Sequence, residues 1–163
     1  MNIIAAVDSS WGIGKDNQLL FDIPQDKKIF REKTTGKTII MGRKTFESLP
    51  CGPLPDRKNI ILTRSSDFDS LSGLTVCHSF EEIKNIIKNI DTDDIFVIGG
   101  EEIYRLFIPL CDTAYITKIS SFSPADKHMI NLDENNDWKC INCSEFYYFK
   151  NTAFRFAVYK RLR

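Results

Sequence analysis

The sequence predicts an α/β fold: a single domain over residues 1–163, with a mostly parallel central sheet, helices on both faces and an antiparallel hairpin at its C-terminal edge. Three observations predict it. Short continuous apolar runs are typical of strands that are buried on both faces. Segments with helical spacing or capping residues alternate with these runs, which favours parallel pairing through helical crossovers. After Pro109 the expected strands become longer and alternate polar with apolar residues, which is typical of antiparallel pairing.

The first elements are a buried strand, a loop and a helix. The run NIIAAV at 2–7 predicts the strand, and the segment that follows is a glycine-containing loop. The segment DIPQ at 22–25 supplies an Asp of N-cap type, an early Pro and a Gln three residues further on. We therefore expect a helix over about 24–35, which begins next to this Asp.

The later elements alternate in the same way. Ser79 is expected to cap one helix, with Glu82 at the position that completes a capping box. The strands expected after the first one are 38–42, 58–63, 74–78, 94–100, 113–120, 144–150 and 153–162. The helices expected after the first one are 43–49, 79–90 and 101–110. In an open sheet of this kind, ligands bind at the carboxyl ends of the strands.

Composition and charge are those of an ordinary globular protein. Hydrophobic residues make up 42% and charged residues 27% of the chain, with 22 basic and 22 acidic side chains. A net charge of zero gives no global attraction for nucleic acid or acidic membranes. The chain shows neither a basic leader nor an apolar run of about 18 residues. We therefore expect a cytoplasmic monomer without nucleic-acid or membrane partners.

The cysteines do not form a recognisable metal site. Cys140 and Cys143 form a lone CxxC in an expected strand at 138–146, where their spacing places the two sulfurs on opposite faces. A zinc site would need a second pair of ligands, and His78 and His128 are isolated. We expect reduced thiols and no metal.

Asp26 is the first candidate for chemistry. Ile23, Asp26 and Phe30 share one face of the expected helix, so a carboxylate lies within an apolar stripe. One interpretation is an acid in the first turn that complements the helix dipole. The other is a half-buried carboxylate that hydrogen-bonds a ligand, with a pKa raised by desolvation.

Glycines and arginines lie at the ends of three expected strands. Gly42 ends one strand and Arg43 follows it, Arg64 follows another strand, and Gly99 and Gly100 end a third. A glycine before a helix is usually only a turn. However, glycines let backbone amides approach an anion, and arginine presents forked donors to phosphate. Together on one sheet edge they favour a dinucleotide, and two arginines without an obvious ribose-binding acid favour NADP over NAD.

Arg57 follows a proline-rich loop and has two interpretations. It is either a solvated surface arginine or a bidentate clamp for a substrate carboxylate. The residue pattern alone leaves both open.

Several motifs in this order resemble those of one family. The runs IIAAV, WGIGKDN, IIMGRKTFESL, PLPDRKNIILTR and VIGG resemble bacterial dihydrofolate reductases, from about residue 2 to the C-terminus. The resemblance implies NADPH-dependent reduction of 7,8-dihydrofolate to tetrahydrofolate, by hydride transfer from nicotinamide C4 to pterin C6. It also implies a role in one-carbon metabolism and binding of antifolates such as trimethoprim and methotrexate.

The same resemblance assigns roles to individual residues. Asp26 would hydrogen-bond the pterin 2-amino group and N3, Thr117 would support Asp26, and Arg57 would pair with the α-carboxylate of the glutamate tail. The residues implied around the pterin and aminobenzoyl group are Ile4, Ala5, Phe30, Leu49 and Leu54. Those implied in the first strand and in the loop over the nicotinamide are Ala6, Ile13, Gly14, Asn17 and Leu19.

Further residues are implied for the rest of the cofactor. Those implied at the adenosine phosphates are Gly42, Arg43, Lys44, Thr45, Thr63, Arg64 and Ser65. Those implied at the pyrophosphate and nicotinamide are Ile98, Gly99, Gly100, Glu101, Ile103 and Tyr104. The family also implies a cis peptide between Gly99 and Gly100.

Three residues depart from the family pattern. Phe21 has no indole donor where relatives often have Trp. Lys27 replaces an apolar residue after the carboxylate and could lay its stem along the benzoyl ring. Glu102 brings a negative charge near the phosphates.

Two rival functions differ in class. A reductase of riboflavin biosynthesis would also use NADPH, but it lacks the paired Asp26 and Arg57. A non-enzymatic nucleotide-binding module would bind the dinucleotide and oxidise nothing. Oxidation of NADPH with and without dihydrofolate separates all three.

Overall fold

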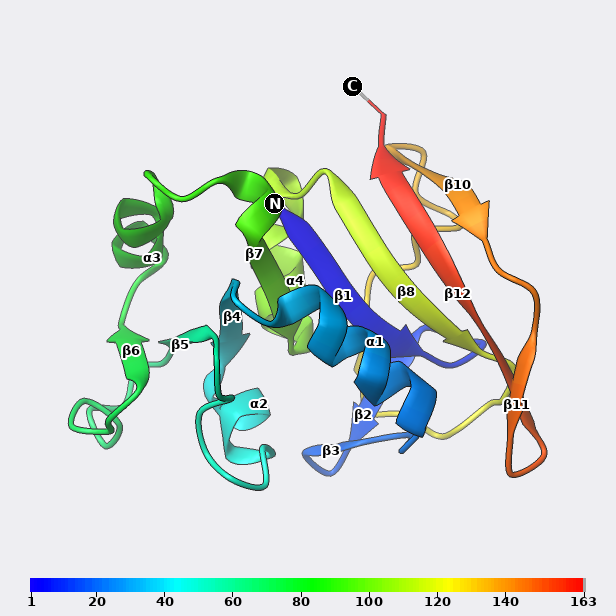
Figure 1. The fold of residues 1–163 in the computed structure, drawn as a ribbon, viewed down its shortest axis with the longest axis horizontal. Helices are drawn as coiled ribbons and strands as arrows, with labels where there is room; N and C mark the ends of the chain where they lie inside the picture. Colours follow the sequence, from blue (N-terminus) through cyan, green and yellow to red (C-terminus); the bar gives the residue numbers. More distant parts are fainter. Residues whose placement is uncertain (163) are drawn as a thin grey trace.

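A nine-stranded mixed sheet runs through the molecule (Figure 1), in a computed structural model that describes residues 1–162. Its strands are β1 (Asn2–Val7), β4 (Thr38–Gly42), β5 (Lys58–Leu62), β6 (Leu74–Cys77), β7 (Ile95–Gly99), β8 (Thr113–Ile119), β10 (Trp138–Cys143), β11 (Tyr147–Phe149) and β12 (Thr152–Arg161). The order across the sheet is β10-β12-β8-β1-β7-β4-β5-β6, with β11 also paired to β12. The pairs from β8 to β6 are parallel, whereas β12 is antiparallel to β8, β10 and β11. The predicted fold class is confirmed.

Helices cover both faces of this sheet. They are α1 (Pro24–Thr34), α2 (Arg43–Glu47), α3 (Phe80–Ile87) and α4 (Glu101–Phe107), and single 3₁₀ turns follow at Thr92–Asp94 and Ile108–Leu110. In Figure 1, α1 lies in front of the sheet and α4 behind it. Ile39 of β4 belongs to the apolar cluster of Phe30 and Phe46, from α1 and α2. Its neighbour Ile40 belongs to the opposite cluster with Phe107 of α4. Strand alternation therefore supplies two cores, and each fully buried Ile contributes about 1.5–3 kcal/mol.

The start of α1 differs from the prediction. The expected cap Asp22 lies one residue too early, and the N-cap is Ile23, which makes no side-chain capping bond. Ile23 is extended (φ −108°, ψ 116°) because it precedes Pro24. The Asp22 carboxylate instead pairs with Lys27 at 2.6 Å. At α3 the predicted cap is confirmed, because the Glu82 amide donates to Ser79 Oγ at 3.2 Å.

The expected loop after β1 contains a hairpin. Its strands are β2 (Gly12–Lys15) and β3 (Gln18–Leu19), and β9 (Lys127–His128) pairs with β2 to make a small second sheet. Asp16 and Asn17 form the turn with φ of 50° and 61°. Consecutive positive φ angles suit a tight hairpin, and Asp and Asn tolerate them better than most residues.

The prediction that Cys140 and Cys143 face opposite sides is wrong. The pairing register shifts between Cys140 and Asn142, so that Cys140 lies opposite Tyr159 and Cys143 opposite Ala157. Tyr159 and Ala157 are two residues apart on β12 and share a face. The bulge therefore places both cysteines on one side of β10. Both are exposed and carry free thiols.

Candidate active site

A half-buried carboxylate and a buried threonine meet where α1 crosses the sheet. Asp26 lies in the first turn of α1, and Thr117 lies on β8, 91 residues further along the chain. Thr117 Oγ1 donates to Asp26 Oδ1 at 2.6 Å, and Thr117 is only 4% exposed. The predicted support of Asp26 by Thr117 is therefore present as a direct hydrogen bond.

The surroundings of Asp26 make its charged form less favourable than it is in water. Burial raises the pKa of the Asp26 carboxyl above its ordinary value. The hydrogen bond from Thr117 and the positive charge of Lys27 lower this pKa and offset only part of the effect of burial. A first-turn acid that merely complemented the helix dipole would be solvated, so the geometry favours the ligand-binding interpretation.

A cavity of about 210 Å³ lies beside this pair. Ile4, Asp26 and Thr117 are the predicted residues that line it, and Lys33 and Tyr115 line it as well. Lys33 Nζ lies 3.9 Å from the centre of the Tyr115 ring, a contact that sequence reasoning missed. The pattern of a single element could not predict this contact, because Lys33 lies on α1 and Tyr115 lies on β8.

The other apolar residues predicted for the substrate divide between two clusters. Phe30, Leu49 and Leu54, none of which lines this cavity, pack against the same buried cluster as Ile4. Ile98, which was predicted for the cofactor, packs against that cluster too. Ala5 instead belongs to the cluster on the opposite face, as its neighbouring position on β1 requires.

Arg57 lies beside Phe30, at the edge of the cluster against which Leu49 and Leu54 also pack. Its Nε donates to Thr34 Oγ1 at 2.8 Å, and Nη1 donates to the Pro55 carbonyl at 2.8 Å. Its guanidinium carbon is 5.9 Å from the centre of the Phe30 ring. Burial and the charge of Arg31 lower the pKa of Arg57, although an arginine remains charged. Arg57 is therefore a half-buried cation whose orientation is fixed by two hydrogen bonds. Its Nη2 has no hydrogen-bond acceptor among residues 1–162.

β4 and β7 are parallel neighbours, so α2 and α4, which follow them, begin close together. A Cβ added to Gly42 would lie 3.0 Å from Ile103 Cγ1, and one added to Gly100 would lie 3.4 Å from Thr45 Oγ1. The Gly99–Gly100 peptide is cis, as the family resemblance implied. The glycine at position 42 thus allows Ile103 of α4 to pack closely on the end of β4, where a larger residue would crowd it.

Tyr104 connects α4 to β1. Its hydroxyl donates to the Ile4 carbonyl at 2.8 Å, and the side chain is buried. Burial, followed by the nearby charge of Asp26, strongly raises the pKa of Tyr104, which stays a neutral donor.

The basic residues predicted for the phosphates lie on the same edge of the sheet. Arg43 is already paired with Glu47 at 3.0 Å, whereas exposed Arg64 has no ion pair or hydrogen bond within residues 1–162. Buried Thr63 accepts a hydrogen bond from the Ser65 amide at 3.1 Å. Lys44 is exposed on α2, and Glu101 pairs with Arg105 at 3.2 Å.

His78 joins this group although the sequence showed it only as isolated. It follows β6, and its Nδ1 lies 2.8 Å from the Thr63 carbonyl. That hydrogen bond raises the pKa of His78, with Asp69 and Glu82 adding to the effect. The available signal was its position after a parallel strand, on the edge that also carries Arg64.

The hairpin residues predicted to close over the nicotinamide lie mostly at the surface. Leu19 is 73% exposed, and Asn17 is exposed in the turn. Ile13 and Gly14 lie on half-buried β2, and neither they nor the turn line the cavity beside Asp26. Ala6 packs with the cluster around Ile23.

The three departures have simple surroundings. Phe21 packs against the cluster of Ile23 and Phe154. Lys27 pairs with Asp22 and is 62% exposed, and Glu102 is exposed on α4.

The architecture narrows the class of protein. An open α/β sheet with its polar groups gathered at the carboxyl ends of parallel strands is typical of nucleotide-dependent enzymes. A family model described as dihydrofolate reductase matches residues 1–161. The chain is 39% identical to a dihydrofolate reductase of Bacillus subtilis (strain 168) over 145 residues, which cover 89% of this chain and 83% of that protein.

Two further relatives agree. The chain is 42% identical to a dihydrofolate reductase of Haemophilus influenzae over 132 residues, covering 81% of this chain and 79% of the relative. It is 33% identical to one of Staphylococcus haemolyticus over 167 residues, covering 100% and 96%. The chain therefore belongs to the dihydrofolate reductase family and is an oxidoreductase. This family reduces dihydrofolate to tetrahydrofolate and implies a nicotinamide cofactor.

Two other findings concern the part of the chain that the structure describes. None of its helices has the length and apolar character needed to cross a membrane. Within residues 1–162, the structure also contains no cluster of three or more His, Cys, Asp or Glu side chains that could hold a metal ion.

Proposed function

We propose that this chain reduces 7,8-dihydrofolate to 5,6,7,8-tetrahydrofolate with NADPH, and so supplies one-carbon metabolism for thymidylate, purine and glycine synthesis. It would act as a monomeric single domain over residues 1–163 in the cytoplasm. The observation that carries the proposal is the half-buried Asp26 carboxyl held by Thr117 beside a cavity. A carboxyl in that position can accept two parallel hydrogen bonds from the amino group and ring N–H of a pterin.

Asp26 is the proposed catalytic residue. Its carboxylate binds the pterin 2-amino group and N3, while the bond from Thr117 fixes the orientation of the carboxyl plane. Because burial raises the pKa of Asp26, the site favours a proton shared between carboxyl and ring. This arrangement supports the protonated pterin, and water delivers the proton to N5.

Arg57 is the proposed clamp for the glutamate tail. Its Nε and Nη1 are held by Thr34 and Pro55, which orients the guanidinium before a ligand arrives. A pre-oriented fork loses less entropy when it binds a carboxylate. Phe30, Leu49 and Leu54 form the apolar wall for the aminobenzoyl group.

The cofactor residues complete the proposal. NADPH, when bound, supplies the hydride from its nicotinamide C4 to pterin C6. Gly42, Thr45, Gly99 and Gly100 would accept its phosphate chain where α2 and α4 begin. Arg64 has free donors for the 2′-phosphate, whereas Arg43 would first have to leave Glu47.

One assay tests this function. Purified protein is mixed with NADPH, and oxidation is followed with dihydrofolate, without it, and with the pyrimidine substrate of the riboflavin pathway. The proposal predicts oxidation only with dihydrofolate and inhibition by methotrexate or trimethoprim. Oxidation with the pyrimidine alone would favour the riboflavin reductase, and binding without oxidation would favour a nucleotide-binding module.

A further inference from the structure

Two free cysteines lie on one face of β10, which is the last strand at one edge of the sheet. The bulge places Cys140 opposite Tyr159 and Cys143 opposite Ala157. Because these partners are two positions apart on β12, the two cysteines begin about 6.6 Å from each other along the strand. Both are exposed, so a ligand can reach the two thiols from solvent. The reduction proposed above uses neither of them.

The Cys140 sulfur is directed along the strand toward Cys143. Its Sγ lies 3.4 Å from the carbonyl oxygen of Asn142, the residue immediately before Cys143. Partial burial, and then the nearby Cys143 thiol, raise the pKa of Cys140, which agrees with two neighbouring sulfurs. Two thiolates side by side repel each other, and a cation between them removes this repulsion. The pair therefore favours a positively charged, thiophilic ligand.

The spacing of the two side chains favours a bridging ion over a direct disulfide. A disulfide requires Cβ atoms about 3.5–4.5 Å apart and an S–S bond of about 2.0 Å. Positions two apart on one face of a strand are about 6.6 Å apart. A bond from a metal to a thiolate is about 2.3 Å long in zinc sites. An ion with two such bonds joins side chains that a direct S–S bond does not reach.

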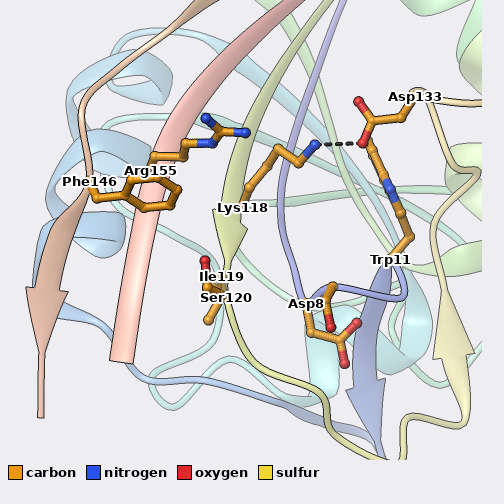
Figure 2. A pocket seen from close by; sticks show the side chains of 9 residues that line it. Asp8, Trp11, Lys118, Ile119, Ser120, Asp133, Phe146 and Arg155 are labelled. Atoms are coloured by element: carbon orange, nitrogen blue, oxygen red, sulfur yellow. Dashed lines mark hydrogen bonds and ion pairs between the residues drawn. The ribbon is translucent and has the colours of Figure 1, made fainter. Parts of the chain in front are cut away.

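The number of available ligands decides the kind of ion. Structural zinc takes four ligands, and residues 1–162 contain no group of three or more His, Cys, Asp or Glu side chains that could hold a metal. Asp133 lies on this face, but its carboxylate already accepts from Lys118 at 2.5 Å (Figure 2) and from the Tyr159 hydroxyl at 2.6 Å. Soft thiolates select monovalent copper, which forms linear complexes with two thiolates and needs no third ligand.

We propose that Cys140 and Cys143 form a two-thiolate site for one soft monovalent metal ion, Cu(I). Each thiol loses its proton when the ion binds, so two protons are released for each ion, and no electron is transferred. The resulting complex carries one net negative charge. Its exposed position on β10 leaves this charge accessible to water, which stabilises it.

Anaerobic titration of the full chain with Cu(I) buffered by bicinchoninate, a coloured chelator, tests the proposal. The wild type should take one equivalent of Cu(I), and two of its three exposed thiols should then stop reacting with a thiol reagent. Cys140→Ser and Cys143→Ser should each weaken Cu(I) binding about a hundredfold or more. The reason is that the second thiolate of a linked pair binds at a high effective concentration.

Cys51 provides a matched control on the same protein. It is the third exposed thiol and lies on the loop after α2, so Cys51→Ser should leave the affinity for Cu(I) unchanged. Circular dichroism checks that each serine variant is folded. Size-exclusion chromatography with and without Cu(I) checks that one chain supplies both thiolates, and the elution volume should stay the same.

Four results would overturn the proposal. They are unchanged affinity in either Cys140→Ser or Cys143→Ser, protection of a single thiol for each bound ion, equal weakening by Cys51→Ser, and dimerisation on addition of Cu(I). None of these readouts depends on reduction of dihydrofolate, so the proposed function and this metal site can fail independently.

Discussion

Replacing Asp26 by Asn tests the central residue with little change in shape. Asp26 Oδ1 accepts the hydroxyl hydrogen of Thr117, and Oδ2 has no hydrogen bond within residues 1–162. Asn can keep the Thr117 bond through its own Oδ1. Its amide then places an N–H group where the pterin also presents an N–H donor. One charged hydrogen bond is lost, and one donor is left facing another.

The expected size of the effect follows from these two losses. A hydrogen bond to a charged group contributes about 1.5–3 kcal/mol, and an unsatisfied buried group costs about 1–3 kcal/mol. Their sum is about 2.5–6 kcal/mol, or roughly two to four powers of ten in kcat/KM at neutral pH. The affinity for NADPH should stay near that of the wild type, because Asp26 makes its side-chain hydrogen bond to Thr117 and not to a residue proposed to bind the dinucleotide.

The assay is a pH–rate profile of wild type and Asp26→Asn with dihydrofolate and NADPH. The variant should regain part of its activity as the pH falls, because solvent can then protonate the substrate directly. Near-normal kcat at neutral pH in a folded Asp26→Asn protein would refute the assignment of Asp26.

Stability gives an independent test with a defined sign. Burial raises the folded pKa of Asp26 above its ordinary value of 3.8, so the folded chain binds this proton more tightly than the unfolded chain. The stabilising contribution is therefore full below about the ordinary value and is lost as pH rises through the folded pKa. Asp26→Asn has no such loss. The free energy of unfolding of the variant minus that of the wild type should therefore increase from acidic to neutral pH. Urea unfolding at both pH values measures the difference, and a decrease would contradict the buried-acid interpretation.

Three further substitutions test the other sites. Arg64→Ala should raise the KM for NADPH about tenfold or more and leave the KM for NADH nearly unchanged; an unaltered preference in steady-state kinetics would remove Arg64 from the phosphate site. Arg57→Leu should weaken methotrexate about tenfold or more but hardly affect trimethoprim, which has no glutamate tail; equal weakening in binding titrations would mean that Arg57 acts through the fold. Asp8→Ala leaves three backbone amides without their acceptor, at about 1–3 kcal/mol each, so the free energy of unfolding should fall by at least about 3 kcal/mol. A fall of under about 1 kcal/mol in urea titrations would show that water replaces the carboxylate.

Local sequence signals located most elements correctly. Continuous apolar runs marked the parallel strands because a strand buried on both faces cannot carry polar residues on either side. Ser79 and Glu82 marked the start of α3 because capping involves groups only three residues apart. Asp22 failed as a cap because the fixed geometry before Pro24 made Ile23 the N-cap.

The candidate site also has features that local sequence predicts and contacts that it does not. The apolar stripe around Asp26 and the glycines after two strands could be recognised within one turn or one strand end. The bond between Asp26 and Thr117 joins residues 91 positions apart, and it exists because β8 lies beside β1 under α1. His78, Lys33 and Tyr115 were missed for the same reason, since each gains its role from a neighbour on another element.

Strand register was decided only by tertiary structure. A single bulge in β10 moved Cys143 to the face of Cys140, although simple alternation placed them apart. In the same way, the pairing of β8 with β12 set Lys118 opposite Arg155, which neither segment reveals alone. Side-chain periodicity is a property of one strand and can be inferred from its sequence. Pairing minimises the free energy of two strands and their surrounding cores together, so the partners of each side chain emerge only when the whole sheet is assembled.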